Sequence, residues 1–431
     1  MFEVSVECSR CGKTFPCNEV LSICDQCGGA LLFRYDLDEL RDKVSKDILT
    51  RRENSFWKFI EFLPLSSIKS IVSLGEPYTP ILRLTKNNNA NFKNLFIKDE
   101  GRLPTGTFKA RGMAVAISKL KELGIKRVAI PSAGNAASAL AAYGAKAGME
   151  VYVFMPKDVP LTILKENVYL GAKIYLVDGL ISHAAEIVEK FEQKHGWFNL
   201  STNKQPYRFE GYKLMAFEIS EQFDWKPPEN IFFPTGGGEG IIGLWKGFKE
   251  LKDLGWIEKM PRLILVQSSG CAPLVKAYNE GKLEVREPWE NAETVAAGLR
   301  VPHPYASYLI FRALKETDGM AVAVEEKEIV SSMETFLKMG VYACPEAAST
   351  LAALRRLGNN GMLDTDEKTL LCITGNAIKY FDIMKLEKNK IPLLTGDAES
   401  LIRYDIGFKD NPSHLIKTDT YKHVSKPSGG K

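Results

Sequence analysis

The sequence predicts an α/β protein built on parallel β-sheets with helices on both faces. From residue 95 onward, short runs rich in β-branched and aromatic residues alternate with longer segments of helical periodicity. Turns of glycine and other small residues follow several of these runs. Short apolar runs are typical of strands buried on both faces, and helical crossovers usually connect parallel strands. We therefore expect doubly wound domains whose ligands bind at the carboxyl ends of the strands.

The bulk composition fits a globular protein of two to three domains. The chain has 431 residues, 45% of them hydrophobic, which at about 150 residues per domain allows a sizeable core. Its 57 basic and 53 acidic residues are spread throughout, so the sequence favours neither nucleic acid nor a membrane surface as a partner. The chain opens without the apolar segment of a signal peptide, and no apolar run approaches the ~18 residues of a membrane span. We expect a cytoplasmic protein.

Cysteines crowd the first predicted segment, residues 1–35. CSRCGK (8–13) and CDQCGG (24–29) are two Cys-x-x-Cys-Gly turns, which together offer four thiolates in a tetrahedron. This pattern predicts a structural zinc ribbon that binds Zn²⁺ through Cys8, Cys11, Cys24 and Cys27. Iron and a site without metal are the alternatives, and Cys17 is left over. A closed shell of four thiolates has no open coordination position, so no catalysis is assigned to it.

The elements after the ribbon follow from spacing. Residues 36–49 (DLDELRDKVSKDIL) carry apolar side chains at helical spacing, which predicts one linker helix. Helices are also indicated at 108–124, which ends at a glycine, and at 136–148. The expected strands are 94–100, 127–131, 149–156, 173–179, 230–238, 263–269 and 369–375. The final residues, KPSGGK, are expected to fray.

Three turns of small residues follow predicted strands and are the candidate ligand sites. PTGTFKARG (104–112) contains Lys109; it is not a Walker A loop, because alanine rather than Ser or Thr follows the lysine. SAGNAAS (132–138) is the second turn. PTGGGEGIIG (234–243) is the third, and its GEGIIG fits the G-x-G-x-x-G pattern of dinucleotide sites. The next strand ends in Gln-Ser-Ser (267–269), without an acidic residue for a ribose hydroxyl, so the nicotinamide alternative is the weaker one.

The third turn also suits a phosphate group. Free amides and the positive end of the helix dipole favour an anion there. The alternative for this turn is a tight turn that allows close helix–sheet packing. The alternative for Lys109, taken alone, is a solvated surface lysine. A phosphate cradle, a lysine and an asparagine at three strand ends match the phosphate, aldehyde and phenolic oxygen of pyridoxal phosphate.

Several segments resemble those of threonine synthases, which are fold-type II pyridoxal-phosphate enzymes. They are PTGTFKARGMA, PSAGNAASALAAYGAKAG, KQPYRFEGYK, PTGGGEG, AAGLRVP, CPEAASTLAAL and CITGNAIKY. The resemblance extends from the cysteine knuckles to about residue 385. It implies two doubly wound parallel-sheet domains behind the ribbon: the linker and start of a large domain at 36–105, a smaller domain at 106–205, the rest of the large domain at 206–395 and a C-terminal extension at 396–431.

The resemblance also implies roles for individual residues. Lys109 forms the Schiff base with the cofactor, Asn135 hydrogen-bonds its phenolic oxygen, and Thr374 faces its pyridine nitrogen. The cofactor phosphate is bound, largely through backbone amides, by Gly236, Gly237, Gly238, Glu239 and Gly240. Ser132 and Arg208 contact the substrate; for Arg208 the alternative is an ion pair at the surface or between domains.

The implied activity is that of a homodimeric lyase of threonine biosynthesis, which converts O-phosphohomoserine and water to threonine and phosphate. The freed Lys109 acts as the base. The chain departs from many threonine synthases at Leu103, Thr107 and Ala110 and in STNKQPYR (201–208), the region that contacts the substrate phosphate. Two related activities therefore stay open: cysteate synthase, which uses O-phosphoserine and sulfite, and serine/threonine dehydratase. A zinc-dependent binding protein on an inactive scaffold is the alternative from another class.

Overall fold

The computed structural model describes residues 2–84, 92–384 and 386. The chain divides into two compact units, Met1–Lys379 and Tyr380–Lys431. Both large sheets and every candidate site residue belong to the first unit. The C-terminal extension predicted at 396–431, with its expected frayed end KPSGGK, lies outside the described residues.

The N-terminal segment is a three-stranded antiparallel sheet in the order β2-β1-β3. Its strands are β1 (Glu3–Cys8), β2 (Thr14–Phe15) and β3 (Leu31–Tyr35). Val6 pairs with Phe15 on one side and with Phe33 on the other. Val6 and Phe33 are completely buried and belong to the same hydrophobic cluster as the helices and the strands of both larger sheets. The ribbon is therefore packed into the protein rather than attached by a linker alone.

The linker forms two short helices, so the prediction of one helix over 36–49 was wrong. The helices are α1 (Leu37–Lys43) and α2 (Lys46–Thr50). Val44 between them is extended, and the Ser45 side chain accepts a hydrogen bond from Ile48 N to cap α2. A serine competes with the helical backbone for hydrogen bonds and favours a cap, which restarts the helix instead of continuing it.

The larger sheet has six strands in the order β12-β11-β10-β13-β5-β4. All neighbours are parallel except β4 and β5 at one edge. The strands are β4 (Ile81–Arg83), β5 (Leu95–Asp99), β10 (Asn230–Pro234), β11 (Arg262–Ser268), β12 (Met320–Val324) and β13 (Thr369–Ile373). The four strands predicted in this region, at 94–100, 230–238, 263–269 and 369–375, are confirmed. The central strands β10 and β13 are buried along their whole length, as a doubly covered sheet requires.

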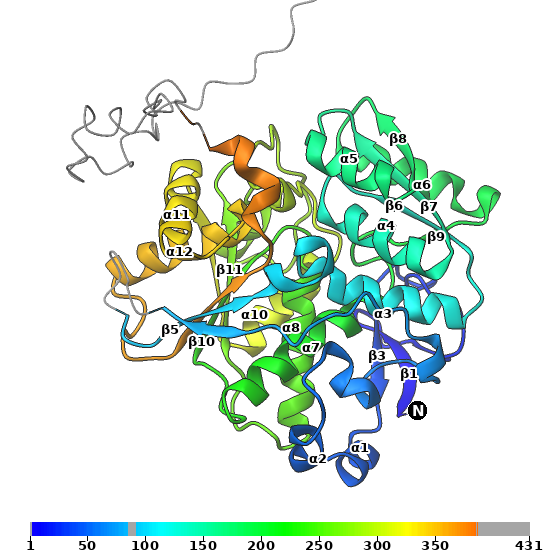
Figure 1. Ribbon diagram of the computed structural model, residues 1–431, viewed down its shortest axis with the longest axis horizontal. Helices are drawn as coiled ribbons and strands as arrows, with labels where there is room; N and C mark the ends of the chain where they lie inside the picture. The colour runs from blue at the N-terminus through cyan, green and yellow to red at the C-terminus, as the bar shows by residue number, and fades with distance from the viewer. Residues whose placement is uncertain (1, 85–91, 385, 387–431) are drawn as a thin grey trace, which may run out of the picture. The chain divides into compact units, whose positions relative to one another are not determined.

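The smaller sheet has four parallel strands in the order β8-β7-β6-β9. They are β6 (Arg127–Pro131), β7 (Glu150–Pro156), β8 (Lys173–Val177) and β9 (Phe198–Asn199), and the first three were predicted. The helices packed against this sheet are α4 (Asn135–Ala147), α5 (Leu161–Tyr169) and α6 (Ile181–His195) (Figure 1).

Further helices cover both faces of the six-stranded sheet. Figure 1 shows α11 (Glu326–Lys338) and α12 (Pro345–Asn359) on the opposite side from α7 (Tyr207–Gln222) and α8 (Glu239–Asp253). The remaining helices are α3 (Lys109–Glu122), α9 (Pro273–Asn279) and α10 (Ser307–Glu316), and the 3₁₀ turns are η1 (Phe56–Phe62), η2 (Ile68–Ser70), η3 (Glu100–Arg102), η4 (Pro104–Gly106), η5 (Ala297–Leu299) and η6 (Ala377–Ile383). A membrane-spanning helix is not found in the part of the chain that the structure describes.

Glycines allow the helices α3, α7 and α8 to pack closely against one another. A Cβ at Gly112 in α3 would meet the Tyr212 ring of α7, and one at Gly243 in α8 would meet Tyr212 Cβ, 2.5 Å away in each case. A Cβ at Gly247 would collide with the backbone of Lys213. Gly112 lies in the first turn of α3 and Tyr212 in the second turn of α7, and the contacts run in step along α7 and α8. The N-terminal ends of the three helices therefore lie near one another. Three positive helix ends at one place favour a bound anion.

Candidate active site

The loop that carries Lys109 is hydrogen-bonded to the loop that carries Thr374. Thr107 and Gly375 form an isolated β-bridge, and Phe108 N donates to Thr374 O at 2.9 Å. Lys109 follows as the first residue of α3. The structure thus brings together two predicted site residues from segments that are far apart in the sequence.

The Lys109 side chain extends over aromatic rings rather than toward a carboxylate. Its Nζ lies 4.5 Å from the centroid of the Phe108 ring and 5.8 Å from that of Tyr212. Among the residues that the structure describes, no hydrogen bond or ion pair engages this amine. An amine in such surroundings is available to a ligand.

The charge state of Lys109 is perturbed in the direction that makes it a nucleophile. Burial first, and then the Arg208 guanidinium, lower the pKa of Lys109 to about 8, while the carboxylates of Glu239 and Glu346 oppose the shift. A lysine amine attacks an aldehyde only in its uncharged form. With a pKa near 8, a useful fraction of Lys109 is uncharged at neutral pH.

Arg111 fixes the turn of α3 on which Lys109 lies. Its fully buried guanidinium contacts Glu100 (Nε–Oε2, 2.5 Å) and Glu218 (Nη1–Oε1, 2.7 Å), and Lys98 Nζ approaches Glu218 at 2.7 Å. Burial opposes ionisation here, but the charges of Arg111 and Lys98 outweigh it and lower the pKa of Glu218 to about 2. Removing one member of such a network leaves an uncompensated buried charge, typically a loss of about 3–5 kcal/mol. Sequence reasoning assigned no role to this network.

The predicted phosphate cradle is the turn between β10 and α8. Side chains do not fit there: Cβ atoms at Gly236, Gly237 and Gly238 would collide in turn with Gly298 O, Thr202 Cγ2 and Ile310 Cδ1. Gly238 has a φ of +93°, which also favours glycine. Glu239 and Gly240 are the first residues of α8, where amides have no partner within the helix. The turn therefore presents backbone amides at a positive helix end, as an anion site requires.

Ser132 and Asn135 lie at the start of α4. Ser132 Oγ accepts hydrogen bonds from the amides of Gly134 (3.3 Å) and Ala137 (3.2 Å). Asn135 Oδ1 accepts from Lys379 Nζ at 3.3 Å, and the same ammonium is 2.8 Å from Glu166. In the structure the Ser132 hydroxyl therefore binds an amide in the first turn of α4, while Asn135 is bridged to Lys379 in η6, just after the Thr374 loop.

Arg208 is completely buried beside the glycine turn. Its Nη2 lies 2.5 Å from Glu239 Oε2 and donates to Tyr212 Oη at 3.2 Å, and its Nη1 donates to Leu200 O at 2.9 Å. Of the alternatives open from the sequence, Arg208 does form an ion pair, but a buried one at the candidate site rather than a pair at the surface. Its Nε is buried and has no partner among the described residues.

Glu346 is a site residue that sequence reasoning missed. It lies in the first turn of α12, 7% exposed, and its Oε1 accepts from Gly298 N at 2.8 Å. Its Oε2 is buried and has no partner among the described residues, and the carboxylate acts electrostatically on Lys109. The neighbouring Cys344 thiol interacts with Thr374, although burial, followed by the Glu346 charge, raises the pKa of that thiol. In the sequence, a glutamate after proline reads as an ordinary favourable charge at a helix start.

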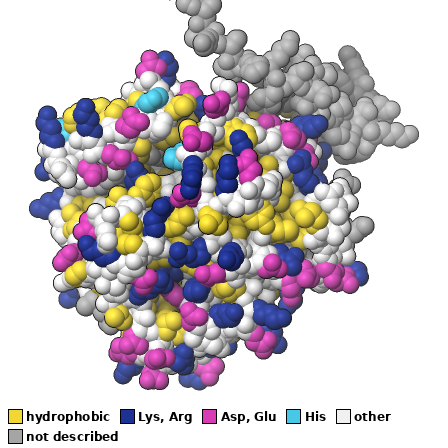
Figure 2. All heavy atoms as spheres, turned by 180° about the vertical axis from the view of Figure 1, so that it is seen from behind, with side chains coloured by type: hydrophobic (Ala, Val, Ile, Leu, Met, Phe, Trp, Pro, Cys, Tyr) yellow, Lys and Arg dark blue, Asp and Glu magenta, His cyan; other side chains and the backbone are white. Residues whose placement is uncertain are grey.

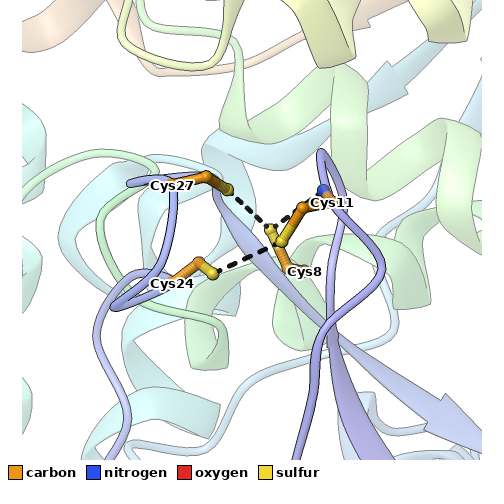
Figure 3. A group of neighbouring side chains, drawn as sticks. All are labelled: Cys8, Cys11, Cys24 and Cys27. Carbon is orange, nitrogen blue, oxygen red and sulfur yellow. Dashed lines mark hydrogen bonds between the residues drawn. The ribbon is translucent and has the colours of Figure 1, made fainter.

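The four predicted cysteine ligands converge in the ribbon (Figure 3). The Sγ atoms of Cys8 and Cys27 are 3.5 Å apart, those of Cys11 and Cys24 are 3.7 Å apart, and all four lie within 4.8 Å of one another. Zinc–sulfur bonds of about 2.3 Å in a tetrahedron place sulfurs about 3.8 Å apart, so the cluster has the right size. These distances are too long for disulfides, and Cys17 stays outside the cluster.

On one face of the molecule the charged groups are mixed in sign. Figure 2 shows Lys and Arg side chains interspersed with Asp and Glu over the face it presents. In the candidate site, by contrast with this exposed face, the charged side chains of Arg208, Glu239 and Glu346 are buried and that of Lys109 is half-buried.

Residues 72–375 match the family described as "Pyridoxal-phosphate dependent enzyme". The chain is similar to a threonine synthase of Methanocaldococcus jannaschii, 36% identical over 86% of this chain and 92% of the relative. It is also similar to a threonine synthase of Methanosarcina acetivorans, 34% identical over 87% of this chain and 92% of the relative.

Solved structures share the fold at lower identity. The processed form of threonine deaminase isoform 2 from Solanum lycopersicum superposes with a TM-score of 0.62 at 20% identity, over 76% of this chain and 91% of that one. Serine racemase from Dictyostelium discoideum gives a TM-score of 0.58 at 23% identity, over 78% and 98%. At such identities the likeness concerns the arrangement of helices and strands only.

Proposed function

Because the chain belongs to the threonine synthase family of pyridoxal-phosphate dependent enzymes, we propose that it converts O-phosphohomoserine and water to L-threonine and phosphate. It is a pyridoxal-phosphate dependent lyase with the fold of that family, as the sequence predicted. The observation that carries the proposal is the 36% and 34% identity to two threonine synthases over more than four-fifths of this chain. The predicted catalytic, cofactor and substrate residues lie within residues 72–375, the region that matches the pyridoxal-phosphate family.

The residues of the site fit the cofactor. The turn at 236–238 excludes side chains and offers amides to a phosphate, and the Lys109 amine has no protein partner among the described residues. The Thr374 loop is hydrogen-bonded to the Lys109 loop, which supports a neutral hydroxyl near the pyridine nitrogen. When bound, pyridoxal phosphate withdraws electrons from the substrate and so acidifies its α- and β-carbon protons.

Lys109 has two tasks in this proposal. It holds the cofactor, and once released it accepts and returns the substrate protons. A lysine amine is a good proton acceptor when its pKa lies near the working pH, and the pKa of about 8 meets that condition. The rings of Phe108 and Tyr212 lie beside its amine.

Arg208 is proposed to contact the substrate phosphate. Its free Nε is a charged donor inside the protein, and a guanidinium can bind a phosphate through two hydrogen bonds. Glu239 neutralises part of this charge in the absence of substrate and holds the guanidinium in place. We further propose that Ser132 and Asn135, at the positive end of α4, face the substrate and the phenolic oxygen of the cofactor.

The ribbon is proposed to bind one structural Zn²⁺ through Cys8, Cys11, Cys24 and Cys27. The size of the sulfur cluster supports this assignment. Four thiolates complete the coordination of zinc, so the metal would stabilise the fold and take no part in the reaction.

One comparison of substrates tests the function. Purified enzyme loaded with cofactor should release phosphate from O-phosphohomoserine and form threonine. A preference for O-phosphoserine with sulfite would make the chain a cysteate synthase, and rapid deamination of free serine or threonine alone would make it a dehydratase. Absence of turnover with all of them, despite a bound cofactor, would favour an inactive scaffold.

We propose a cytoplasmic homodimer that acts on a small phosphorylated amino acid, without nucleic acid or membrane as a partner. The division at residues 36, 106, 206 and 396 is likewise proposed, on the strength of the family resemblance. Sedimentation equilibrium of the full chain would decide between monomer and dimer.

A further inference from the structure

The start of α7 is held between two contacts with the ribbon, one on each side of Arg208. Tyr207 is completely buried, and its Oη accepts a hydrogen bond from Leu21 N at 2.8 Å and donates to Glu19 O at 3.3 Å. Its ring also packs against Phe33 of β3, with centroids 5.9 Å apart. The residue before Arg208 is therefore fixed by the ribbon.

The second contact lies two residues past Arg208. Tyr35 Oη, at the end of β3, donates to Glu210 Oε2 at 2.8 Å. Glu210 is fully buried and pairs with Lys213 (2.6 Å) and with Lys246 of α8 (3.0 Å). Lys213 Nζ in turn lies 3.8 Å from the centroid of the Tyr35 ring. One ribbon tyrosine thus contacts α7 directly and α8 through the buried charges.

The ribbon segment that contacts Tyr207 has little structure of its own. Residues 16–22 form neither helix nor strand, and they connect β2 to the second cysteine knuckle. Cys11 and Cys24 stand on either side of this segment, and their sulfurs lie 3.7 Å apart, so a metal bound to both would close the loop. A bound metal closes it by bonds, and removal of the metal takes that closure away.

The knuckles are themselves docked on α10. Tyr308 Oη lies 2.8 Å from Ser9 Oγ and accepts from Ala30 N at 2.8 Å, and Arg312 Nη2 donates to Ser9 O at 2.8 Å. These bonds hold the ribbon against the body of the protein. The segment at 19–21 is then the part whose position depends on the metal.

We propose that the metal-closed ribbon positions Arg208, with Tyr207 as the positioning residue, so that loss of the metal weakens binding of the phosphorylated substrate while the Lys109 end of the site is preserved. This inference rests on the proposed role of Arg208. The effect is confined to the start of α7, because Lys109 is fixed through the Thr374 loop and through Arg111, whose partners are Glu100 and, in the C-terminal half of α7, Glu218. A Cys₄ site that is closed to ligands would in this way control substrate affinity from outside the active site.

The test compares Tyr207→Phe with a matched variant, Tyr78→Phe, in the cofactor-loaded full chain. Each change removes one tyrosine hydroxyl that joins α7 to another segment. Tyr207 Oη, in the first turn of α7, bonds the ribbon residues 19 and 21, and Tyr78 Oη donates to Glu221 Oε2 at the other end of the helix, at 2.6 Å. Tyr207→Phe keeps the ring and should raise KM for O-phosphohomoserine about two- to tenfold with little change in kcat. Tyr78→Phe should leave KM unchanged. An equal change of KM in both variants would overturn the inference.

A second experiment tests the role of the metal by removing it. Dialysis of the wild type against a chelator under reducing conditions should raise KM in the same range, and added Zn²⁺ should restore it. The same treatment should add little in Tyr207→Phe, because the contact is already lost. A full additional increase in that variant would show that the metal does not act through Tyr207.

Hydrogen exchange gives a readout that does not depend on activity. Amides in the first turns of α7 should exchange faster after metal removal, and those of α3 should not. If the wild type fails to turn over any phosphorylated substrate, the proposed function fails, and exchange alone then decides the inference. Unchanged exchange in α7 after verified loss of zinc would refute it.

Discussion

Arg208 and Glu239 form a completely buried ion pair, with 2.5 Å between Nη2 and Oε2. Each residue lies in the first turn of its helix, so the pair joins the starts of α7 and α8 at the glycine turn. Burial of two charges is costly unless they are paired and hydrogen-bonded, and here Tyr212, Leu200, Asn203 and Gln205 supply the further bonds. The pair therefore holds in place the guanidinium that we propose to bind the substrate phosphate.

Arg208→Lys should reduce kcat/KM for O-phosphohomoserine by about 2–4 kcal/mol, a factor of roughly thirty to a thousand. Lysine keeps the charge but cannot reproduce two parallel hydrogen bonds to a phosphate. Any dehydratase activity on free serine or threonine should change much less, because these substrates lack the phosphate. Steady-state kinetics with both substrate types is the measurement, and equal losses would refute a phosphate role.

Lys109→Ala should abolish the yellow absorbance of bound cofactor and reduce turnover by at least about a thousandfold. Lys121→Ala, an exposed lysine of the same helix, should behave as wild type. In the wild type, borohydride should bleach the absorbance and leave the reduced adduct on Lys109. Peptide mapping that finds the adduct on a different lysine would contradict the assignment.

Capture of pyridoxal phosphate by the cofactor-free enzyme should accelerate with rising pH and level off above about 8, the pKa of Lys109. Only the uncharged amine reacts, and its fraction grows as the pH approaches the pKa. The charged groups that act on it are Arg208 from α7, Glu239 from α8 and Glu346 from α12. The rate of absorbance growth after mixing reports this step.

Glu346→Gln should move that transition to lower pH. The Glu346 carboxylate favours the charged amine and raises the pKa of Lys109, so neutralising it lets burial lower the pKa further. Glu122→Gln, at the far end of α3, is the matched control and should leave the transition in place. A transition at the same pH in wild type and Glu346→Gln would show that Glu346 does not act on Lys109.

Cys24→Ser should lower the zinc content well below one ion per chain and reduce the resistance of the N-terminus to proteolysis. Three thiolates bind zinc less tightly than four, and the metal contributes to local folding. Cys17→Ser should keep the full metal content, because Cys17 lies outside the cluster. Elemental analysis of the purified variants decides; undiminished zinc in Cys24→Ser would exclude this residue as a ligand.

Local sequence patterns predicted most strands of the two larger sheets, because a buried strand and the turn after it are specified by residues that are adjacent in the sequence. The runs at 127–131 and 369–375 became β6 and β13. The linker at 36–49 was misread because Leu, Val and Ile keep helical spacing across Ser45, and spacing cannot show that this serine caps a new helix.

The contacts between charged residues of the site could not be predicted from local sequence patterns. Lys109, Glu239 and Glu346 come from three separate helices, and only the packed fold brings their charges together. The resemblance to threonine synthases indicated Lys109 and Arg208, but Glu346 lies in a segment whose role it did not specify. The partner of Arg208 was equally hidden, because Glu239 was interpreted as part of a phosphate cradle rather than as a counter-ion.

The glycine contacts between α7 and α8 have a consequence for interpreting natural variants. A single-base change converts a glycine codon to an alanine codon, and at Gly243 the added methyl group would meet Tyr212 Cβ at 2.5 Å. Such an allele would retain every ligand-contacting residue, yet the helix starts that carry Arg208 and Glu239 would be displaced from one another. A classification of alleles by ligand contact alone would score it as neutral, whereas a growth assay without supplied threonine would expose it.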